Sequence, residues 1–424
     1  MAVMGVRIGI YNRSMSAKGG GEKRTLVLAD HLSRNHQVFL IVPERPELSS
    51  LERYFDVDLG RVNVVSLDEP SLPGRCLKAL GGLLSFRWEN LIEQFISLRQ
   101  VKGLKLDVFI NNSYGSDLAC PAPLGIYMCM FPHAPQLAVA RHGLARRAFA
   151  GLLARVKEGA LGYHPNPIGT YAEVTANSQY TREWVEKLWG RRASVVYSAC
   201  DHVEAPLDDA KEKIILNIGR FDVYKRQDIQ LDVFKSLREL HDSGWQLHFV
   251  GSTSGQAATR DYTARLLKEA GGHPIFFHFD ADLQTLRGLC RRASVYWHAT
   301  GYGLPADEHP DKQEHFGMAT VEAMSAGAVP VVINSGGQRE IVRHGVNGFV
   351  WDDLRSLAEN TRLLASDAQL RGRLGRRART SVAKFSRAAF NEQMDRILER
   401  MLRECGAAPA ARGGSEGHIA TSCE

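Results

Sequence analysis

Short apolar runs alternate with longer amphipathic stretches along this chain, a pattern typical of parallel sheets covered by helices. In the first half the pattern predicts strands at Val6 to Tyr11, Gln37 to Val42, Asp107 to Asn111, Gly125 to Met130, Glu173 to Asn177 and Ser194 to Tyr197. A second series predicts strands at Lys213 to Ile218, Gln246 to Gly251, Pro274 to Phe279, Ser294 to His298 and Val329 to Ile333. Two such series indicate an α/β protein with two Rossmann-like domains that face each other across a cleft.

The interruption between the two series sets the predicted domain boundaries. The segment from Asp201 to Lys211 contains a proline and several acids, so it is the candidate linker. We expect one domain over residues 1–205 and a second over residues 206–388. A helical pattern follows over residues 389–404, and the small, polar residues 405–424 lack periodicity, which predicts a disordered tail.

The stretch from Glu314 to Glu322 combines two carboxylates with a predicted helix, which should begin near Phe316 or Gly317 and end at Gly327. The free backbone N–H groups at such a start can bind an anion such as a diphosphate. Glu322 lies about five residues into the helix, roughly 7 to 8 Å along its axis. A nucleoside diphosphate sugar across this start would offer ribose hydroxyls to Glu322 and sugar hydroxyls to Glu314. Taken alone, the two glutamates could also be solvated surface residues.

Two basic residues follow the strand predicted at 213–218. Arg220 and Lys225 should therefore lie at the carboxyl end of a sheet, where open α/β folds bind ligands. Breaking the bond between a sugar and a diphosphate leaves negative charge on the phosphate, and two cations stabilise that charge. The alternative is a solvated basic turn.

A run of glycines separates the first strand from the helix predicted at 22–35. Gly19, Gly20 and Gly21 let backbone amides approach a phosphate or sugar, although any tight turn between a strand and a helix favours glycine. The run is neither G-x-G-x-x-G nor a Walker sequence, which argues against a dinucleotide oxidoreductase and a P-loop protein. The donor-binding candidates are Gly19, Gly20, Gly21, Phe316, Gly317, Met318, Ala319, Thr320 and Glu322.

The sequence EHFGMATVEAMSAGAVPVV, which begins at Glu314, resembles the E-x7-E signature of the retaining glycosyltransferases of family 4. Residues 334–342 (NSGGQREIV), 344–349 (HGVNGF) and 217–221 (NIGRF), followed by Lys225, are also similar to that family. Residues 176–182 (ANSQYTR) and 225–228 (KRQD) resemble the branch with the eukaryotic mannosyltransferases that extend lipid-linked oligosaccharides and their bacterial relatives.

This resemblance implies a GT-B fold, in which the last helix crosses back onto the first domain and the glycine loop faces the diphosphate. It implies transfer of a hexose from GDP-mannose or a UDP-sugar to a hydroxyl of a glycan or lipid-linked acceptor, with retention of anomeric configuration. The alternatives are a nucleotide-sugar epimerase, a glycan phosphorylase or a non-catalytic nucleotide-sugar-binding protein.

The family also places a histidine that contacts the donor sugar near the end of a strand in the first domain. The usual order puts that histidine before an aromatic-proline pair, but Met130 holds this place here, and His133 follows the pair. His133 is thus the candidate, with a structural histidine as the alternative. The catalytic candidates are Arg220, Lys225, Glu314 and His133.

Two D-x-D triplets raise the question of a metal, because other glycosyltransferases bind a divalent cation through such a pair. We predict structural roles for Asp56 and Asp58, and for Asp280 and Asp282, with Asp282 capping a helix at 283–292. With Arg220 available to meet phosphate charge, we expect no metal and no cofactor beside the nucleotide sugar as substrate.

Charge and composition restrict the partners. Residues 136–161 form a basic amphipathic pattern, which predicts either a surface helix or a helix lying on an anionic membrane. No basic run carries the interleaved aromatic residues of a nucleic-acid platform, so we expect no nucleic acid. No apolar run approaches the roughly 20 residues that span a bilayer, and the seven scattered cysteines are typical of reduced thiols. We expect a cytoplasmic protein, with peripheral contact at the inner membrane face if the basic helix binds lipid.

Overall fold

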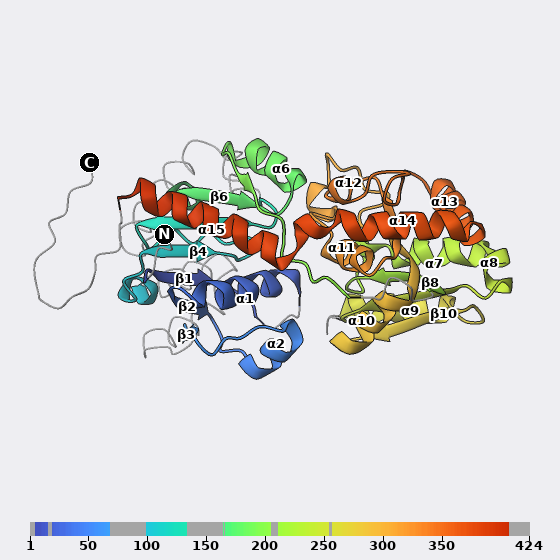
Figure 1. Cartoon of the computed structure of the whole chain (residues 1–424), viewed down its shortest axis with the longest axis horizontal. Coiled ribbons are helices and arrows are strands. Elements are labelled where there is room, and N and C mark those ends of the chain that lie inside the picture. The colour runs from blue at the N-terminus through green and yellow to red at the C-terminus, as the bar shows by residue number, and fades with distance from the viewer. Residues whose placement is uncertain are drawn as a thin grey trace, which may run out of the picture.

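The computed structural model describes residues 5–15, 19–67, 99–133, 164, 166–204, 211–253 and 257–406. These residues form two α/β domains that lie side by side along the long axis of the molecule (Figure 1). The predicted fold class, with two Rossmann-like domains and a last helix that returns to the first, is confirmed. The basic segment 136–161 and most of the predicted tail lie outside the described residues.

In the first domain, the described strands form a seven-stranded parallel sheet with the order β3-β2-β1-β4-β5-β6-β7. The strands are β1 (Arg7–Tyr11), β2 (Gln37–Val42), β3 (Asn63–Ser66), β4 (Val108–Asn111), β5 (Leu124–Cys129), β6 (Glu173–Ala176) and β7 (Ser194–Val195). The central strands β1, β4 and β5 are almost entirely buried, because helices cover both faces of the sheet.

In the second domain, the described strands form a six-stranded parallel sheet with the order β10-β9-β8-β11-β12-β13. The strands are β8 (Glu212–Ile218), β9 (Gln246–Gly251), β10 (Ile275–Phe279), β11 (Ala293–His298), β12 (Val329–Ile333) and β13 (Phe349–Trp351). In both sheets the central pair, β1 with β4 and β8 with β11, is where the strand order reverses. Ligands of open α/β folds bind at the carboxyl ends of the strands at this point.

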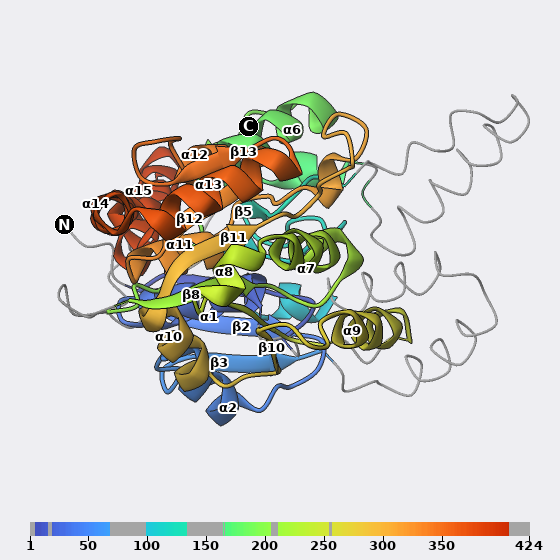
Figure 2. The ribbon, with the colours of Figure 1, turned by 90° about the vertical axis from the view of Figure 1, so that its right-hand side faces the viewer.

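Helices α1 (Gly20–Ser33), α2 (Leu48–Phe55) and α15 (Arg387–Glu404) share one apolar core with the first sheet, and α6 (Gln179–Trp189) lies on its other face. On the second sheet, one core is built with α7 (Gln227–Ser236), α8 (Arg238–Asp242), α9 (Ala257–Glu269) and α13 (Leu354–Ser366). The other is built with α10 (Leu283–Arg292), α11 (Met318–Ser325) and α14 (Ala368–Ser381). Figure 2 shows α7 and α9 on one side of this domain and α10, α11 and α14 on the other.

The described part of the chain crosses between the domains in two places that lie next to each other. Cys200, at the end of the first domain, forms a parallel bridge with Ser386, and its N–H donates to the carbonyl of Phe385 at 3.0 Å. Helix α15 begins at this second crossing and runs over the first sheet, whereas α14 covers the second (Figure 1). Its buried residues Phe390 and Met394 complete the core of the first domain.

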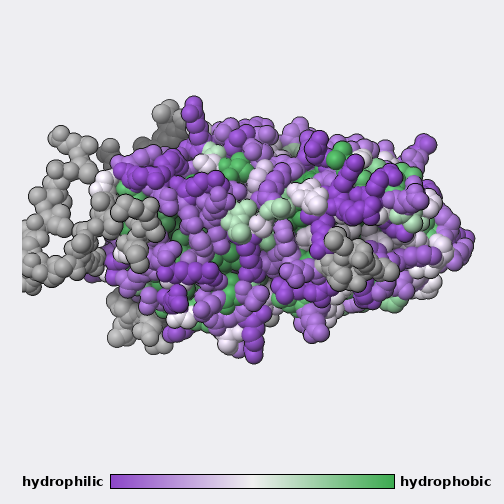
Figure 3. All heavy atoms as spheres, viewed as in Figure 1, coloured by the Kyte–Doolittle hydropathy of each residue, from purple (hydrophilic) through white to green (hydrophobic). Residues whose placement is uncertain are grey.

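The face seen in Figure 3 is mostly hydrophilic, with hydrophobic residues in small groups. Within the described residues, none of the helices has the length and apolar character needed to cross a bilayer. The described cysteines, Cys120, Cys129, Cys200, Cys290 and Cys405, are free thiols.

Candidate active site

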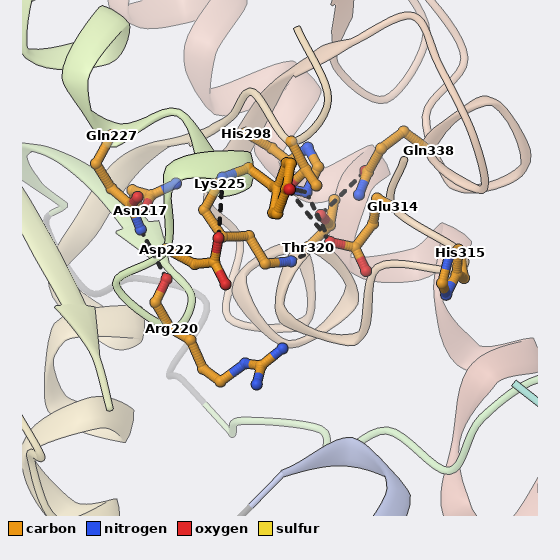
Figure 4. Close-up of polar contacts among 12 residues, drawn as sticks. Asn217, Arg220, Asp222, Lys225, Gln227, His298, Glu314, His315, Thr320 and Gln338 are labelled. Atoms are coloured by element: carbon orange, nitrogen blue, oxygen red, sulfur yellow. Dashed lines mark hydrogen bonds and ion pairs between the residues drawn. The ribbon is translucent and has the colours of Figure 1, made fainter. Parts of the chain in front are cut away.

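The first carboxylate of the E-x7-E stretch lies in a small polar cluster at the carboxyl ends of β8 and β11. The Lys225 ammonium, in the turn η3 (Val223–Lys225) after β8, lies 2.7 Å from Oε2 of Glu314. The same oxygen lies 3.0 Å from Nε2 of His298, the last residue of β11. Burial alone would raise the pKa of Glu314, but Lys225 and His298 outweigh it and hold this pKa well below its ordinary value. Glu314 is thus an ionised acceptor next to a fixed cation (Figure 4).

His298 was not predicted as a site residue. Its side chain is 5% exposed, and burial lowers its pKa although the bond to Glu314 opposes that shift. A neutral ring can donate from Nε2 to the Glu314 carboxylate. The hydroxyl of Thr300 lies 2.9 Å from the same nitrogen. The signal in the sequence was a polar side chain at the carboxyl end of an otherwise apolar strand.

Close backbone packing fixes the loop that carries Glu314. The N–H of Gly337 donates to the Glu314 carbonyl at 2.8 Å, and a Cβ on Gly336 would come within 2.2 Å of that carbonyl oxygen. Gly336 also has a φ of +57°. Larger residues would therefore push this loop away, which explains the two glycines of the NSGG segment.

Arg220 extends apart from the cluster formed by Lys225 and Glu314 (Figure 4). Its carbonyl accepts from the Gln227 amide at 3.0 Å, while its side chain is exposed. Burial raises the pKa of Glu22 on α1, and the charge of Arg220 is one of the influences that oppose this shift. Arg220 thus lies near the first domain at the glycine loop.

Helix α11 begins at Met318, and its N-cap Gly317 has a φ of +118°, a backbone conformation that favours glycine. A Cβ on Gly317 would come within 2.4 Å of the Gln338 amide nitrogen, and Thr320 donates to the Gln338 oxygen at 3.0 Å. Phe316 is buried between Tyr197 and Phe385. Of the predicted donor-binding residues, Phe316 and Thr320 therefore hold the helix start in place through packing and a buried hydrogen bond.

The glycine loop of the first domain contacts this helix start. A Cβ on Gly20 would lie 2.7 Å from the sulfur of Met318, and one on Gly21 would lie 3.2 Å from the sulfur of Met130. Gly19 is the N-cap of α1, with extended backbone. Gly20 and the N-terminus of α11 are therefore brought together from different domains, whereas Gly21 lies against Met130 of its own domain.

The second carboxylate, Glu322, is also engaged across the domains. Its Oε1 lies 2.5 Å from Nζ of Lys23 on α1, and this nitrogen lies 3.0 Å from Oδ2 of Asp201. The side chains of Lys23, Glu322 and Asp201 are 8%, 17% and 13% exposed. Neither Lys23 nor Asp201 was predicted as a site residue, because 299 residues separate Lys23 from Glu322.

His133 makes its polar contacts inside the first domain. Its Nε2 lies 2.8 Å from the Asp117 carboxylate, and its carbonyl accepts from the indole of Trp189 at 3.0 Å. The residue of this segment that contacts the second domain is Phe131, whose ring stacks on His315 with 4.3 Å between the ring centroids. The described contacts thus bring Phe131, not His133, against the E-x7-E loop.

Three of the four aspartates in the D-x-D triplets accept hydrogen bonds from backbone N–H groups. Asp58 accepts from the N–H of Gly60 at 2.9 Å, and Asp280 accepts from the N–H of Thr253 at 3.0 Å. Asp282 caps α10 by accepting from the N–H of Thr285 at 2.7 Å, as predicted. These bonds give the three side chains structural roles.

A cavity of about 560 Å³ opens in the first domain beyond the ends of β1 and β2. Its lining combines guanidinium, carboxylate and hydroxyl groups with apolar side chains: Arg13, Ser14, Met15, Pro43, Glu44, Arg45, Pro46, Glu47, Ser50 and Leu51. The two arginines balance the two glutamates, so the lining as a whole suits a neutral, hydroxyl-rich ligand better than a highly charged one.

Two family models match adjoining parts of the chain. Residues 18–204 match the model described as Glycosyltransferase Family 4, and residues 201–381 match the model described as Glycosyl transferases group 1. The two matches meet at residues 201–204, where the chain leaves the first domain.

Two of the matched curated relatives, from different organisms, carry the same description. The "GDP-Man:Man(3)GlcNAc(2)-PP-Dol alpha-1,2-mannosyltransferase" of Dictyostelium discoideum is 26% identical over 259 residues, 56% of this chain and 49% of the relative. The Homo sapiens protein of that description is 26% identical over 257 residues, 56% of this chain and 50% of the relative. The chain thus spans about half the length of these curated relatives.

Solved structures show the same fold at lower identity. Anabaena HepE in complex with UDP and glucose has a TM-score of 0.64 and 17% identity to this chain, and the match covers 93% of this chain and 99% of that one.

Proposed function

Because this chain belongs to the family-4 glycosyltransferases with the GT-B fold, we propose that it transfers a hexose from a nucleotide sugar to a hydroxyl of a glycan or lipid-linked acceptor. One observation carries the proposal: Lys225 and His298 meet Glu314, which lies in the loop that leads into α11, at the switch point of the second sheet. The glycine loop of the first domain closes on the same helix start.

The proposed reaction breaks the bond between the anomeric carbon and a phosphate oxygen of the donor. The electron pair stays on that oxygen, where Lys225, Arg220 and the backbone N–H groups at the start of α11 stabilise the charge. The acceptor oxygen forms the new bond on the same face of the sugar, and its proton passes to the leaving phosphate. Glu314 holds a sugar hydroxyl, and Glu322 holds the ribose.

We propose GDP-mannose as the donor, because the curated relatives are described as GDP-mannose-dependent enzymes. A UDP-sugar is the alternative, since Anabaena HepE, of the same fold, was solved with UDP and glucose. The residues proposed to bind the donor are assigned to its sugar, phosphate and ribose groups, which are not the base, so they favour neither nucleotide.

The acceptor is proposed to bind to the first domain. The 560 Å³ cavity beyond β1 and β2 is lined by carboxylate acceptors, guanidinium donors and the apolar side chains of Met15 and Leu51. This combination suits saccharide rings. The pyrophosphate-linked lipid named for the curated relatives makes a lipid-linked glycan the first acceptor to test.

Arg220 and Lys225 can meet the charge of the leaving diphosphate, so we propose that transfer needs no divalent metal. Assays in EDTA should retain full activity, and restoration by Mg²⁺ or Mn²⁺ after loss in EDTA would refute this. The described cysteines are free thiols, which are typical of reducing compartments. We therefore propose a cytoplasmic protein that can act peripherally at the inner membrane face.

A thermal-shift panel of GDP- and UDP-sugars, followed by transfer assays with lipid-pyrophosphate-linked oligosaccharides, tests the proposal. One donor should raise the melting temperature, because a ligand that binds the folded state stabilises it. The same donor should then glycosylate the acceptor with retained anomeric configuration. Conversion of the donor without acceptor would indicate an epimerase, phosphorolysis of a glycan would indicate a phosphorylase, and tight binding without turnover a binding protein.

A further inference from the structure

We infer that Lys23 of the first domain is a positioning residue of the donor site, which holds the Glu322 carboxylate so that it binds the ribose hydroxyls. This inference rests on the proposed binding of a nucleotide sugar at Glu322. It makes the donor site a property of both domains, because Lys23 lies on α1 and Glu322 lies on α11.

The geometry restricts the carboxylate. Nζ of Lys23 lies 2.5 Å from Oε1 of Glu322, so the ammonium and this oxygen are in direct contact. A hydrogen bond between charged groups is shorter and stronger than one between neutral groups, and it limits the rotamers of both side chains. With Oε1 held by Lys23, Oε2 is the oxygen that we assign as acceptor for a second donor, such as a ribose hydroxyl.

Lys23 is itself held from the opposite side. Its Nζ lies 3.0 Å from Oδ2 of Asp201, whose carboxylate also pairs with Arg387 at 2.6 Å and with Arg287 at 3.6 Å. Asp201 lies where the chain first leaves the first domain, and Arg387 lies where it returns. The ammonium is therefore fixed at the junction of the two domains by a carboxylate that has partners of its own.

Lys23 is charged in this setting. Burial alone would lower the pKa of Lys23, but the carboxylates of Glu322 and Asp201 outweigh it and raise the pKa above its ordinary value. A buried ammonium between two carboxylates is costly to remove, because a neutral side chain would leave both carboxylates without their shared cation. The test therefore separates the contribution of Lys23 to stability from its contribution to ribose recognition.

The test compares GDP with 2′,3′-dideoxy-GDP by isothermal titration calorimetry, and UDP with its dideoxy analogue if UDP binds more tightly. We expect Lys23→Met to weaken binding of GDP roughly tenfold or more and to leave the dideoxy nucleotide almost unchanged. The preference of the wild type for ribose hydroxyls should thus nearly disappear. Glu322→Gln should give the same pattern, and the double variant should lose no more than the single ones.

Lys23→Arg keeps a cation at this place and should restore part of the preference. Arg287→Met is the matched control, since it removes a partner of Asp201 without touching Glu322 and should keep the full preference. If Lys23→Met does not fold, Lys23→Gln serves in its place.

Equal losses for GDP and dideoxy-GDP in Lys23→Met would show that Lys23 acts through general stability or domain orientation and would overturn the inference. So would an unchanged preference. A wild type that binds neither GDP nor UDP would instead refute the proposed function itself. A wild type that binds GDP and dideoxy-GDP equally tightly would refute the role of Glu322.

Discussion

Lys225 carries one of the two positive charges assigned to the leaving diphosphate, and Glu314 fixes its ammonium at 2.7 Å. We expect Lys225→Ala to lower kcat by a factor of about 10² to 10³ with a much smaller effect on the donor KM, because the cation acts mainly on charge that develops in the transition state. Steady-state kinetics with saturating acceptor measure both constants.

Lys213→Ala is the matched control for Lys225. Lys213 lies in β8, the strand that precedes the turn with Lys225, and its ammonium donates to the Ser243 carbonyl on the surface. Its removal should change neither constant beyond twofold. Equal kcat for Lys225→Ala and wild type would show that Lys225 only positions Glu314.

His315 gives the contact between the domains a dependence on pH. Burial lowers the pKa of His315 to about 4, whereas an unfolded histidine titrates near 6.5. Between these values the unfolded chain binds more protons than the folded one, so the folded state loses stability as pH falls from about 6.5 towards 4. At about 1.4 kcal/mol per pKa unit, this difference corresponds to at most about 3 kcal/mol of stability. Solvent around the partly accessible ring lowers the loss below this limit.

Urea unfolding of wild type and His315→Asn at pH 6.5 and pH 4.5 measures this effect. The variant should lose less stability between the two values than the wild type. His309→Asn, at an exposed position nearby, should behave like the wild type. Identical losses in His315→Asn and wild type would mean that His315 titrates normally.

At the scale of elements, the glycine loop and α11 meet closely. An Ala side chain at Gly20 would place its Cβ 2.7 Å from the Met318 sulfur, so Gly20→Ala should displace the Met318 side chain at the helix start and raise the donor KM several-fold. Gly20→Ala combined with Met318→Ala removes the clash and should recover much of the donor affinity. Gly103→Ala, in open space, should leave the donor KM unchanged. A double variant no better than the single one would argue against this contact.

The elements of the fold could be predicted from the sequence where apolar runs were long and buried. The bounds of β2, β9 and β12 agree with the prediction residue for residue. The strands β3 and β13 were not predicted, because they are short and lie at the edges of their sheets. Their pairing depends on the neighbouring strand more than on their own composition.

At the scale of the whole molecule, the sequence made Glu314, Glu322, Arg220 and Lys225 candidates but did not predict the contacts that they make. The pair of Lys225 with Glu314 joins residues 89 apart, and the pair of Lys23 with Glu322 joins different domains. Spacing along the chain predicts which side chains share a helix or a sheet edge. It does not predict how two domains are oriented, so Lys23 and Asp201 were missed.

Helix α15 follows the second domain in the sequence but supplies part of the core of the first. Phe390 is 1% exposed and packs in the same cluster as β1 and α1. Truncating a buried phenylalanine to alanine costs about 3 to 5 kcal/mol. We therefore expect Phe390→Ala to destabilise the first domain selectively. Hydrogen exchange followed by mass spectrometry should show faster exchange in β1, β2 and α1, with β12 and α13 protected as in wild type.

The control for Phe390 is Leu363→Ala, on the surface of α13, where the side chain is 44% exposed and its removal should change exchange in neither domain. The last helix closes the core of the first domain, so this domain should be complete only when the chain has been synthesised through residue 404. Faster exchange in both domains of Phe390→Ala would mean that they unfold as one unit. Unchanged exchange in β1, β2 and α1 would mean that α15 is not needed for the first core.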